Sequence, residues 1–189
     1  MKQAAKKIIQ ESIDVKSLIL KDEKFLDQIE ACANMMLSAL NAGNKILIFG
    51  NGGSAADSQH FAAELVSRFQ KERRALAAIA LSTDTSILSA IGNDYSFDKI
   101  FERQIEAVGR QGDVAFAIST SGRAKNVLLA VKAARSAGMK TIGLTGGKDG
   151  ELAGCVDLAF RVPSQVTARV QEAHILIIHA LCQLVEENL

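Results

Sequence analysis

The sequence predicts an α/β protein in which two N-terminal helices precede a five-stranded parallel sheet, doubly wound with helices on both faces. Short apolar runs recur from Lys45 onward, and amphipathic stretches of helical length separate them. A single proline occurs, and no low-complexity linker divides the chain. Strands that alternate with helices form right-handed βαβ units and a parallel sheet that is covered on both faces. We expect one domain over residues 1–189, with a helical extension at 1–43 and an α/β sandwich at 44–189.

The N-terminal extension, residues 2–43, is predicted to form two helices. In the second, one apolar stripe recurs at steps of three or four residues: Phe25, Ile29, Cys32, Met36 and Leu40. Gly43 and Asn44 then end the helix. The stripe suits packing against the protein's own domain and also an oligomer interface, and the pattern leaves both open.

The apolar runs that follow predict five strands, at Lys45–Phe49, Ala77–Leu81, Val114–Ile118, Thr141–Leu144 and Leu158–Val162. Helical segments are expected at about 54–70, 84–108, 123–137 and 167–188. Ligands of such sheets bind beyond the carboxyl ends of the strands. The residues that follow each strand are therefore the candidates for function.

Composition excludes several classes of protein. Hydrophobic residues make up 48% of the chain, charged residues 23%, and the net charge is +1, which gives no bulk reason to expect a nucleic-acid or membrane partner. The strongest apolar run, 175–181, is too short to span a bilayer, and the N-terminus lacks the apolar core of a signal peptide, so we expect a cytoplasmic protein. Cys32, Cys155 and Cys182 have no C-x-x-C spacing and are expected to be small buried hydrophobes.

The loop after the first strand is rich in glycine: Gly50-Asn51-Gly52-Gly53-Ser54-Ala55. It formally matches the G-x-G-x-x-A pattern of dinucleotide sites, which is weak by itself. Such sites want an acidic residue about 20 positions on, whereas Asp84 follows the second strand about thirty residues past the glycines. We therefore favour a tight turn whose backbone N–H groups approach a polar ligand, with hydrogen bonds added by the side chains of Asn51 and Ser54.

The loop after the third strand, Ser119-Thr120-Ser121-Gly122, is predicted to open a helix. Three hydroxyls would then meet the positive end of a helix dipole, which suits a phosphate dianion. A helix N-cap alone needs only one such residue, and no Walker lysine pattern indicates nucleotide hydrolysis. Further along the chain than the second strand, Asn93 and Asp94 read, from spacing alone, as a helix end and turn.

The histidines suggest acid–base or metal chemistry. His60 and Glu64 are four residues apart on a predicted helix, about 400° around it, so their side chains point the same way and can clamp zinc or form a surface pair. On the C-terminal helix, Gln171 and His179 lie about 80° apart, while His174 faces elsewhere and is the expected structural histidine. His179 has apolar neighbours, which fits either a core residue or a functional group with a tuned pKa.

These groups suit proton transfer on a sugar phosphate. Moving a carbonyl between C2 and C1 needs a base for the carbon-bound proton and an acid or Lewis acid for the oxygens. Glu64 could be the base and His179 the acid, with a metal stabilising the enediolate. Glu64 cannot easily be a tight metal ligand and a free base at the same moment, so its coordination must be loose or must change during turnover.

Taken together, these stretches resemble the bacterial phosphoheptose isomerases, members of the SIS superfamily, whose fold is flavodoxin-like. The resemblance covers nearly the whole chain and rests on residues 50–57, 59–64, 90–94, 118–122, 144–146 and 170–179. It implies one zinc per subunit, held by His60, Glu64, Gln171 and His179, with Glu64 as base and His179 as acid. It also implies substrate contacts by Asn93 and Asp94, against the interpretation from spacing. The expected substrate-binding set is Asn51, Gly52, Gly53, Ser54, Glu64, Asn93, Asp94, Ser119, Thr120, Ser121 and Gln171.

The same resemblance implies a homotetramer with active sites between subunits. The reaction it implies is conversion of D-sedoheptulose 7-phosphate to D-glycero-D-manno-heptose 7-phosphate, for lipopolysaccharide core or related glycans. The chain departs from the family pattern at Ala124, where a serine often stands. The adjacent Arg123 could compensate electrostatically, so we expect phosphate binding to persist.

Two other SIS proteins offer alternative functions. One is a non-enzymatic tetramer that binds the bacterial replication initiator, which this chain resembles at 167–172. That relative lacks the carboxylate and the histidine that match Glu64 and His179, so the enzyme is favoured. The other is a sugar-phosphate sensor fused to a DNA-binding domain, which is disfavoured because no helix-turn-helix precedes the sheet.

Overall fold

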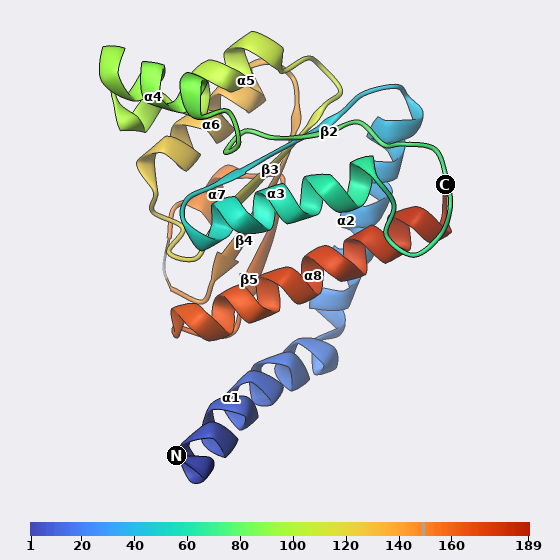
Figure 1. Ribbon diagram of the computed structural model, residues 1–189. Helices are drawn as coiled ribbons and strands as arrows, with labels where there is room; N and C mark the ends of the chain where they lie inside the picture. Colours follow the sequence, from blue (N-terminus) through green and yellow to red (C-terminus); the bar gives the residue numbers. More distant parts are fainter. Residues whose placement is uncertain (149) are drawn as a thin grey trace.

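The computed structural model describes residues 1–148 and 150–189 and contains a five-stranded, all-parallel sheet with helices on both faces (Figure 1). The predicted fold class is thereby confirmed. In chain order the elements are α1 (Lys2–Lys21), α2 (Glu23–Asn41), β1 (Ile46–Gly50), α3 (Gly53–Val66), β2 (Ala78–Ala80), α4 (Thr85–Asp94), the 3₁₀ helix η1 (Phe97–Lys99), α5 (Glu102–Val108), β3 (Val114–Ser119), α6 (Lys125–Ser136), β4 (Lys140–Gly146), α7 (Leu152–Cys155), β5 (Leu158–Val162) and α8 (Thr167–Glu187).

The strand order β2-β1-β3-β4-β5 reverses its direction between β1 and β3. The strand β2 lies on one side of β1 in the sheet, and β3 lies on its other side, so the chain passes back across β1 on its way from β2 to β3. The loops that follow β1 and β3 therefore start from neighbouring strands, with Gly50 opposite Ile118 in the register, and diverge. This is the topological switch point at which open α/β sheets bind ligands.

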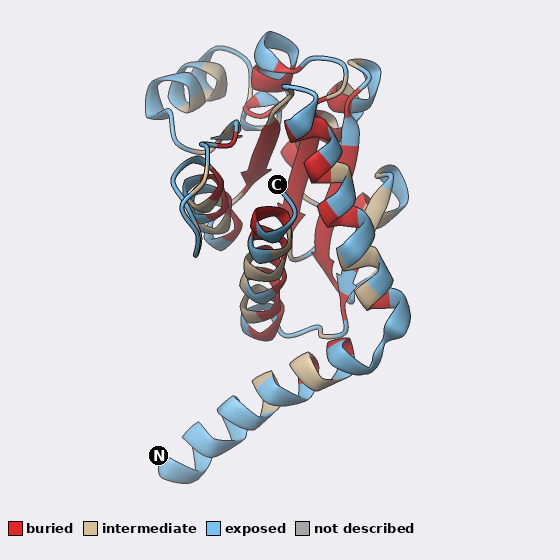
Figure 2. Ribbon diagram, turned by 90° about the vertical axis from the view of Figure 1, so that its right-hand side faces the viewer, coloured by how far each residue is buried: buried red, intermediate tan, exposed pale blue. Residues whose placement is uncertain are grey.

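Alternation along the strands divides the core between the two faces of the sheet. Ile46 and Ile48 of β1 point to a core shared with α2, α3 and α8, whereas Leu47 and Phe49 point to a core shared with α5, α6 and α7. Successive side chains of a strand point to opposite faces, so a strand buried on both sides is apolar throughout. Buried residues accordingly fill the centre of the molecule, between the helices and the sheet (Figure 2).

The helical segments differ from the sequence prediction in several places. The helix expected over 84–108 is broken into α4, η1 and α5, because Ser96 has extended backbone (φ −170°, ψ 161°). The helix expected over 54–70 ends at Val66, and residues 67–76 form a loop whose backbone N–H groups bond elsewhere. The short helix α7 was not predicted.

The cysteine prediction holds for two of the three residues. Cys32 and Cys182 are buried, as expected, but Cys155 at the end of α7 is exposed, so the prediction for it was wrong. All three thiols are free.

Helix α1 extends away from the sheet and exposes most of its surface (Figures 1 and 2). Val15 and Ile19 are its buried residues. Arg169 of α8 anchors it by donating a hydrogen bond to the Ile8 carbonyl oxygen at 2.8 Å and pairing with Glu11 at 3.6 Å. Among the described residues, no helix combines the length and apolar character needed to cross a bilayer.

Candidate active site

The glycine loop after β1 forms a tight turn, as its sequence predicts. A Cβ on Gly50 would lie 2.6 Å from the Ile118 carbonyl oxygen, so only glycine allows the two strands' ends to approach this closely. Gly52 has φ +56°, a left-handed conformation that side chains disfavour, and it is the N-cap residue of α3. The turn brings the start of α3, with the buried Ser54, to the carboxyl edge of the sheet.

A pair of amides joins this loop to the element after β3. Asn51 and Asn126 exchange two side-chain hydrogen bonds of 2.9 Å each, and the Asn126 amide oxygen also accepts from the N–H of Val127 at 2.9 Å. Asn126 is buried in the first turn of α6. Sequence analysis missed it, because nothing local to Asn126 marks a partner 75 residues away. The pair holds the predicted ligand-binding Asn51 in one orientation across the switch point.

The serine loop after β3 also turns as expected, but α6 begins later than predicted, at Lys125 rather than directly after Gly122. The side-chain oxygens of Ser119 and Ser121 accept hydrogen bonds within the turn, from the N–H groups of Gly122 and Arg123, both at 3.2 Å. Gly122 has φ +64°, and a Cβ there would lie 2.9 Å from the Thr145 hydroxyl. The hydroxyls thus line a rigid turn just ahead of the positive end of α6.

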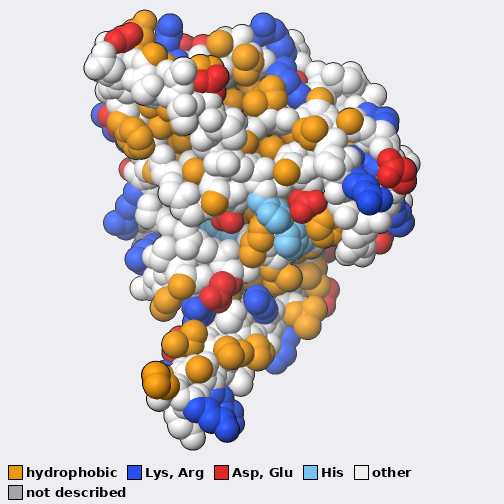
Figure 3. Space-filling view, in the orientation of Figure 1, with side chains coloured by type: hydrophobic (Ala, Val, Ile, Leu, Met, Phe, Trp, Pro, Cys, Tyr) orange, Lys and Arg blue, Asp and Glu red, His pale blue; other side chains and the backbone are white. Residues whose placement is uncertain are grey.

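Three predicted metal ligands converge on the surface between α3 and α8. The Nε2 atom of His60 lies 2.9 Å from Nε2 of His179 and 3.1 Å from Oε1 of Glu64, and ligand atoms of all three residues lie within 4.8 Å of one another. Histidine side chains reach the surface here with an acidic side chain beside them (Figure 3). Two imidazole nitrogens and a carboxylate oxygen are donors that suit Zn²⁺. The donor set and its convergence therefore fit a zinc ion.

The convergence depends on the way α3 and α8 pack. The two helices lie side by side in Figure 1 and run in the same direction, since Gly53 is next to Gln171 and His60 is next to His179. His60 and Glu64 share one face of α3, as their spacing predicts, and that face meets His179, 119 residues further on. The Phe69 ring also packs against His179, with ring centroids 5.4 Å apart.

Gln171, the fourth predicted ligand, is half-buried at the start of this helix pair. Its amide nitrogen lies against Gly53, so tightly that a Cβ on Gly53 would overlap it. Gln171 precedes His179 by eight residues, about 12 Å along the helix axis. The Gln171 amide thus contacts the glycine loop, while His179 lies about two turns further along α8.

Two further ionisable groups lie near these residues. Burial raises the pKa of Asp57, one turn before His60, to about 6, and positive charge on His60 opposes the shift. Sequence analysis assigned Asp57 no role, although it falls within the stretch that matches the family. Burial lowers the pKa of His174 to about 4, so its fully buried ring is neutral at pH 7, in keeping with the structural role expected for it.

Asn93 and Asp94 are the last residues of α4, where spacing suggested a helix end. Both are exposed, and the Asn93 amide donates to the Asp94 carboxylate at 2.8 Å. No hydrogen bond among the described residues ties them to the two loops or to the histidine cluster. Asn93 and Asp94 therefore lie on a separate element, α4, and not on either loop.

Comparisons with known proteins show what the chain as a whole is similar to. The signature of the SIS domain family matches residues 10–146. The chain is 50% identical over 189 residues to the phosphoheptose isomerase of Clostridium acetobutylicum, covering 100% of this chain and 96% of that protein. It is 54% identical over 187 residues to that of Aquifex aeolicus, covering 99% and 97%. The solved phosphoheptose isomerase of Neisseria gonorrhoeae superposes with a TM-score of 0.92 at 46% identity, over 98% of each chain.

Proposed function

The chain belongs to the phosphoheptose isomerases, a family of SIS-domain proteins, and on that premise we propose that it converts D-sedoheptulose 7-phosphate to D-glycero-D-manno-heptose 7-phosphate. It is an isomerase enzyme. The observation that carries the proposal is the convergence of His60, Glu64 and His179 between α3, which starts at the glycine loop, and α8. The replication-initiator alternative is not supported, because the full-length relatives are named isomerases and both acid–base residues are present.

The chemistry assigns one proton route to each acid–base residue. Glu64 removes a proton from C1 of the ketose and returns it to C2, while His179 moves a proton between the two oxygens. Carbon and oxygen protons are both conserved, so no co-reactant is needed. The two side chains meet across the α3–α8 junction, within reach of one small substrate.

Zinc is the cofactor we propose, one ion per subunit, held by His60, Glu64, Gln171 and His179. When bound, it would polarise the substrate oxygens and stabilise the negative charge of the enediolate. His60, Glu64 and His179 fit it through their converging donors. Gln171 fits it least well, since its amide packs on Gly53. Glu64 serves as base only if its coordination to the metal is loose or changes during turnover.

The remaining substrate contacts in the proposal come from the loops. The serine loop, Ser119, Thr120 and Ser121, binds the phosphate at the start of α6, where Ala124 provides no hydroxyl. Asn51, Gly52, Gly53 and Ser54 contact the sugar from the glycine loop, with Gln171 beside them. Asn93 and Asp94 contribute from α4.

The direct test is conversion of sedoheptulose 7-phosphate by the purified protein, followed as appearance of the aldose. We expect turnover in the presence of zinc. Absence of turnover under every metal condition would overturn the proposal, and capture of the replication initiator would then become the next measurement.

Ser121→Ala is expected to raise KM for sedoheptulose 7-phosphate by about 10-fold to 100-fold, because a hydrogen bond to a charged group contributes about 1.5–3 kcal/mol. We expect kcat to change less than twofold, since the phosphate is remote from the reacting carbons. Ser136→Ala, at the exposed far end of α6, the helix that follows the serine loop, is the matched control. An unchanged KM in Ser121→Ala would remove the main support for the phosphate loop.

A homotetramer with sites between subunits is the assembly we propose, and helix α1 supports it. Ile9, Ile13 and Leu20 form an apolar stripe on α1, at about 180°, 220° and 200° around the helix. They lie about 80–160° around the helix from the buried Val15 and Ile19 and are exposed, Ile9 to 60% and Ile13 to 48%. Such a stripe, on a helix that extends from the domain, suits burial against other copies of the chain.

Replacing Ile9 and Ile13 together by Glu is expected to break the tetramer into smaller species, because burying unpaired carboxylates is costly. Sedimentation velocity gives the mass, and turnover should fall in parallel if sites lie between subunits. Lys7→Glu, on a different face of α1, should leave the assembly intact. A wild-type protein that sediments as a stable monomer would refute the assembly.

Cytoplasmic location and supply of heptose for lipopolysaccharide core or related glycans complete the proposal. The three free thiols suit a reducing compartment. The heptose route rests on the family alone.

A further inference from the structure

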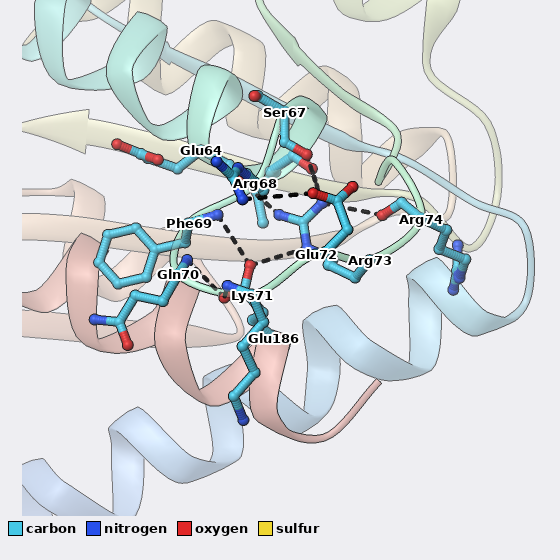
Figure 4. Close-up of polar contacts among 11 residues, drawn as sticks. Glu64, Ser67, Arg68, Phe69, Gln70, Lys71, Glu72, Arg73, Arg74 and Glu186 are labelled. Carbon is cyan, nitrogen blue, oxygen red and sulfur yellow. Dashed lines mark hydrogen bonds and ion pairs between the residues drawn. The ribbon is translucent and has the colours of Figure 1, made fainter.

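The loop between α3 and β2 is held by a buried carboxylate. Glu186, near the end of α8, accepts hydrogen bonds from the backbone N–H groups of Phe69, Gln70 and Lys71 at 2.5–2.9 Å (Figure 4). Its side chain is only 2% exposed. Burial raises the pKa of Glu186, but the three N–H donors and the charge of Arg73 outweigh it, so the pKa lies below its usual value. The carboxylate is therefore ionised, and it anchors the loop to α8.

Arg73 links this carboxylate to the end of α3. Its Nε lies 3.2 Å from Glu186 Oε2, with the Arg73 side chain 8% exposed. The same guanidinium donates to the backbone carbonyls of Glu64 and Leu65, at 2.7 and 2.8 Å, and to that of Ser67 at 3.1 Å. These are carbonyls at the C-terminus of α3, which lack helical partners and favour a cation. Arg73 thus forms hydrogen bonds to the turn of α3 that carries Glu64.

Glu186 and Arg73 together therefore contact both helices that carry the histidine cluster, α3 and α8. Glu186 follows His179 by seven residues, about two turns, and lies on the same side of α8. Glu64 contributes its own carbonyl to the Arg73 fork. Phe69, whose N–H Glu186 accepts, packs its ring on His179. One ionic cluster thus fixes the end of α3 against α8 and supports the ring of His179.

We propose that Glu186 and Arg73 are positioning residues for the isomerase: they set the separation of Glu64 and His179, and with it the geometry of proton transfer and metal binding. This inference rests on the proposed function. Neither side chain is assigned a contact with substrate, so their effect passes through Glu64 and His179. A misplacement of 1 Å in such an arrangement can cost about a hundredfold in rate.

The chain contains a second buried carboxylate that resembles Glu186 in its hydrogen bonds but, among the described residues, does not contact the helices of the histidine cluster. Asp113, 1% exposed, accepts from the backbone N–H groups of Lys45 and Arg110 and pairs with the Lys45 ammonium at 2.6 Å. It lies where β1 and β3 begin, at the amino-terminal edge of the sheet. Asp113→Asn therefore reproduces the loss of a buried, hydrogen-bonded charge without touching α3 or α8. Glu187→Gln, the exposed neighbour on α8, controls for surface charge.

The experiment compares Glu186→Gln with Asp113→Asn and Glu187→Gln in the full chain. We expect Glu186→Gln and Asp113→Asn to lower Tm by similar amounts. Only Glu186→Gln should lower kcat by tenfold or more, with KM changed less than threefold, and weaken the Zn²⁺ Kd of the metal-stripped protein, measured against a chromophoric chelator. A kcat and a Zn²⁺ Kd in Glu186→Gln within twofold of those of Asp113→Asn would overturn the proposal.

A second variant covers the case in which Glu186→Gln does not fold. Arg73→Lys keeps the positive charge beside Glu186 but loses the planar fork that reaches several carbonyls. We expect a kcat and a Zn²⁺ Kd between those of the wild type and Glu186→Gln, and wild-type values would contradict the proposal. A wild-type protein without turnover would refute the proposed function. The Zn²⁺ Kd values of the variants would still test the positioning role.

Discussion

Glu64→Gln is expected to lower kcat for sedoheptulose 7-phosphate by about a thousandfold, within the range of 10²–10⁴ that general base catalysis supplies. Glutamine has nearly the same shape and keeps an oxygen that can face His60, but it cannot accept the C1 proton. Exchange of the C1 hydrogen with solvent deuterium should be lost to the same degree. Mass spectrometry of the recovered substrate measures this exchange, and aldose formation measures turnover.

Glu72→Gln is the control for this change. Glu72 lies in the loop after α3, its side chain is 85% exposed, and it pairs only weakly with Arg68 at 3.4 Å. It should keep wild-type turnover and exchange. If Glu64→Gln retained a kcat within tenfold of the wild type, another group would have to be the base, and Asp57, with its raised pKa, would be the first to examine.

Removal of zinc is expected to lower turnover by at least about a hundredfold, because Lewis-acid stabilisation contributes several kcal/mol and each 1.4 kcal/mol is tenfold in rate. Stripping the protein with a chelator, dialysing it and adding back zinc should restore the wild type. His179→Ala should lose both activity and zinc, since it removes one donor of the cluster and the proposed acid. Zinc per chain is measured by elemental analysis beside each assay.

The two halves of this prediction separate the roles of the metal and the histidine. Full turnover in protein that carries far less than one zinc per chain would show that the metal is dispensable. His179→Ala that binds zinc like the wild type but is inactive would keep His179 as the acid and remove it as a ligand. If added zinc restored the turnover of His179→Ala, His179 could not be the acid.

Much of the fold and part of the site could be predicted from local pattern. Apolar runs and helical stripes predicted the sheet, its parallel winding and the two N-terminal helices, because burial on both faces dictates those patterns. The glycine loop was predicted as a tight turn, and the positive φ of Gly52 agrees with it. The spacing of His60 and Glu64 correctly predicted one helical face. These features depend on neighbours within a few residues, which the sequence displays directly.

Only the tertiary structure decided which of these faces meet. Periodicity says that His179 lies on a helix face, but the parallel packing of α3 on α8 brings it to His60. The same holds for Asn51 with Asn126, and for Glu186 with the loop that ends α3 early. Cys155 sits in an apolar-looking stretch but ends a short surface helix, so its exposure could not be foreseen. Long-range pairings arise from the packing of whole elements, and no local spacing encodes the identity of a partner a hundred residues away.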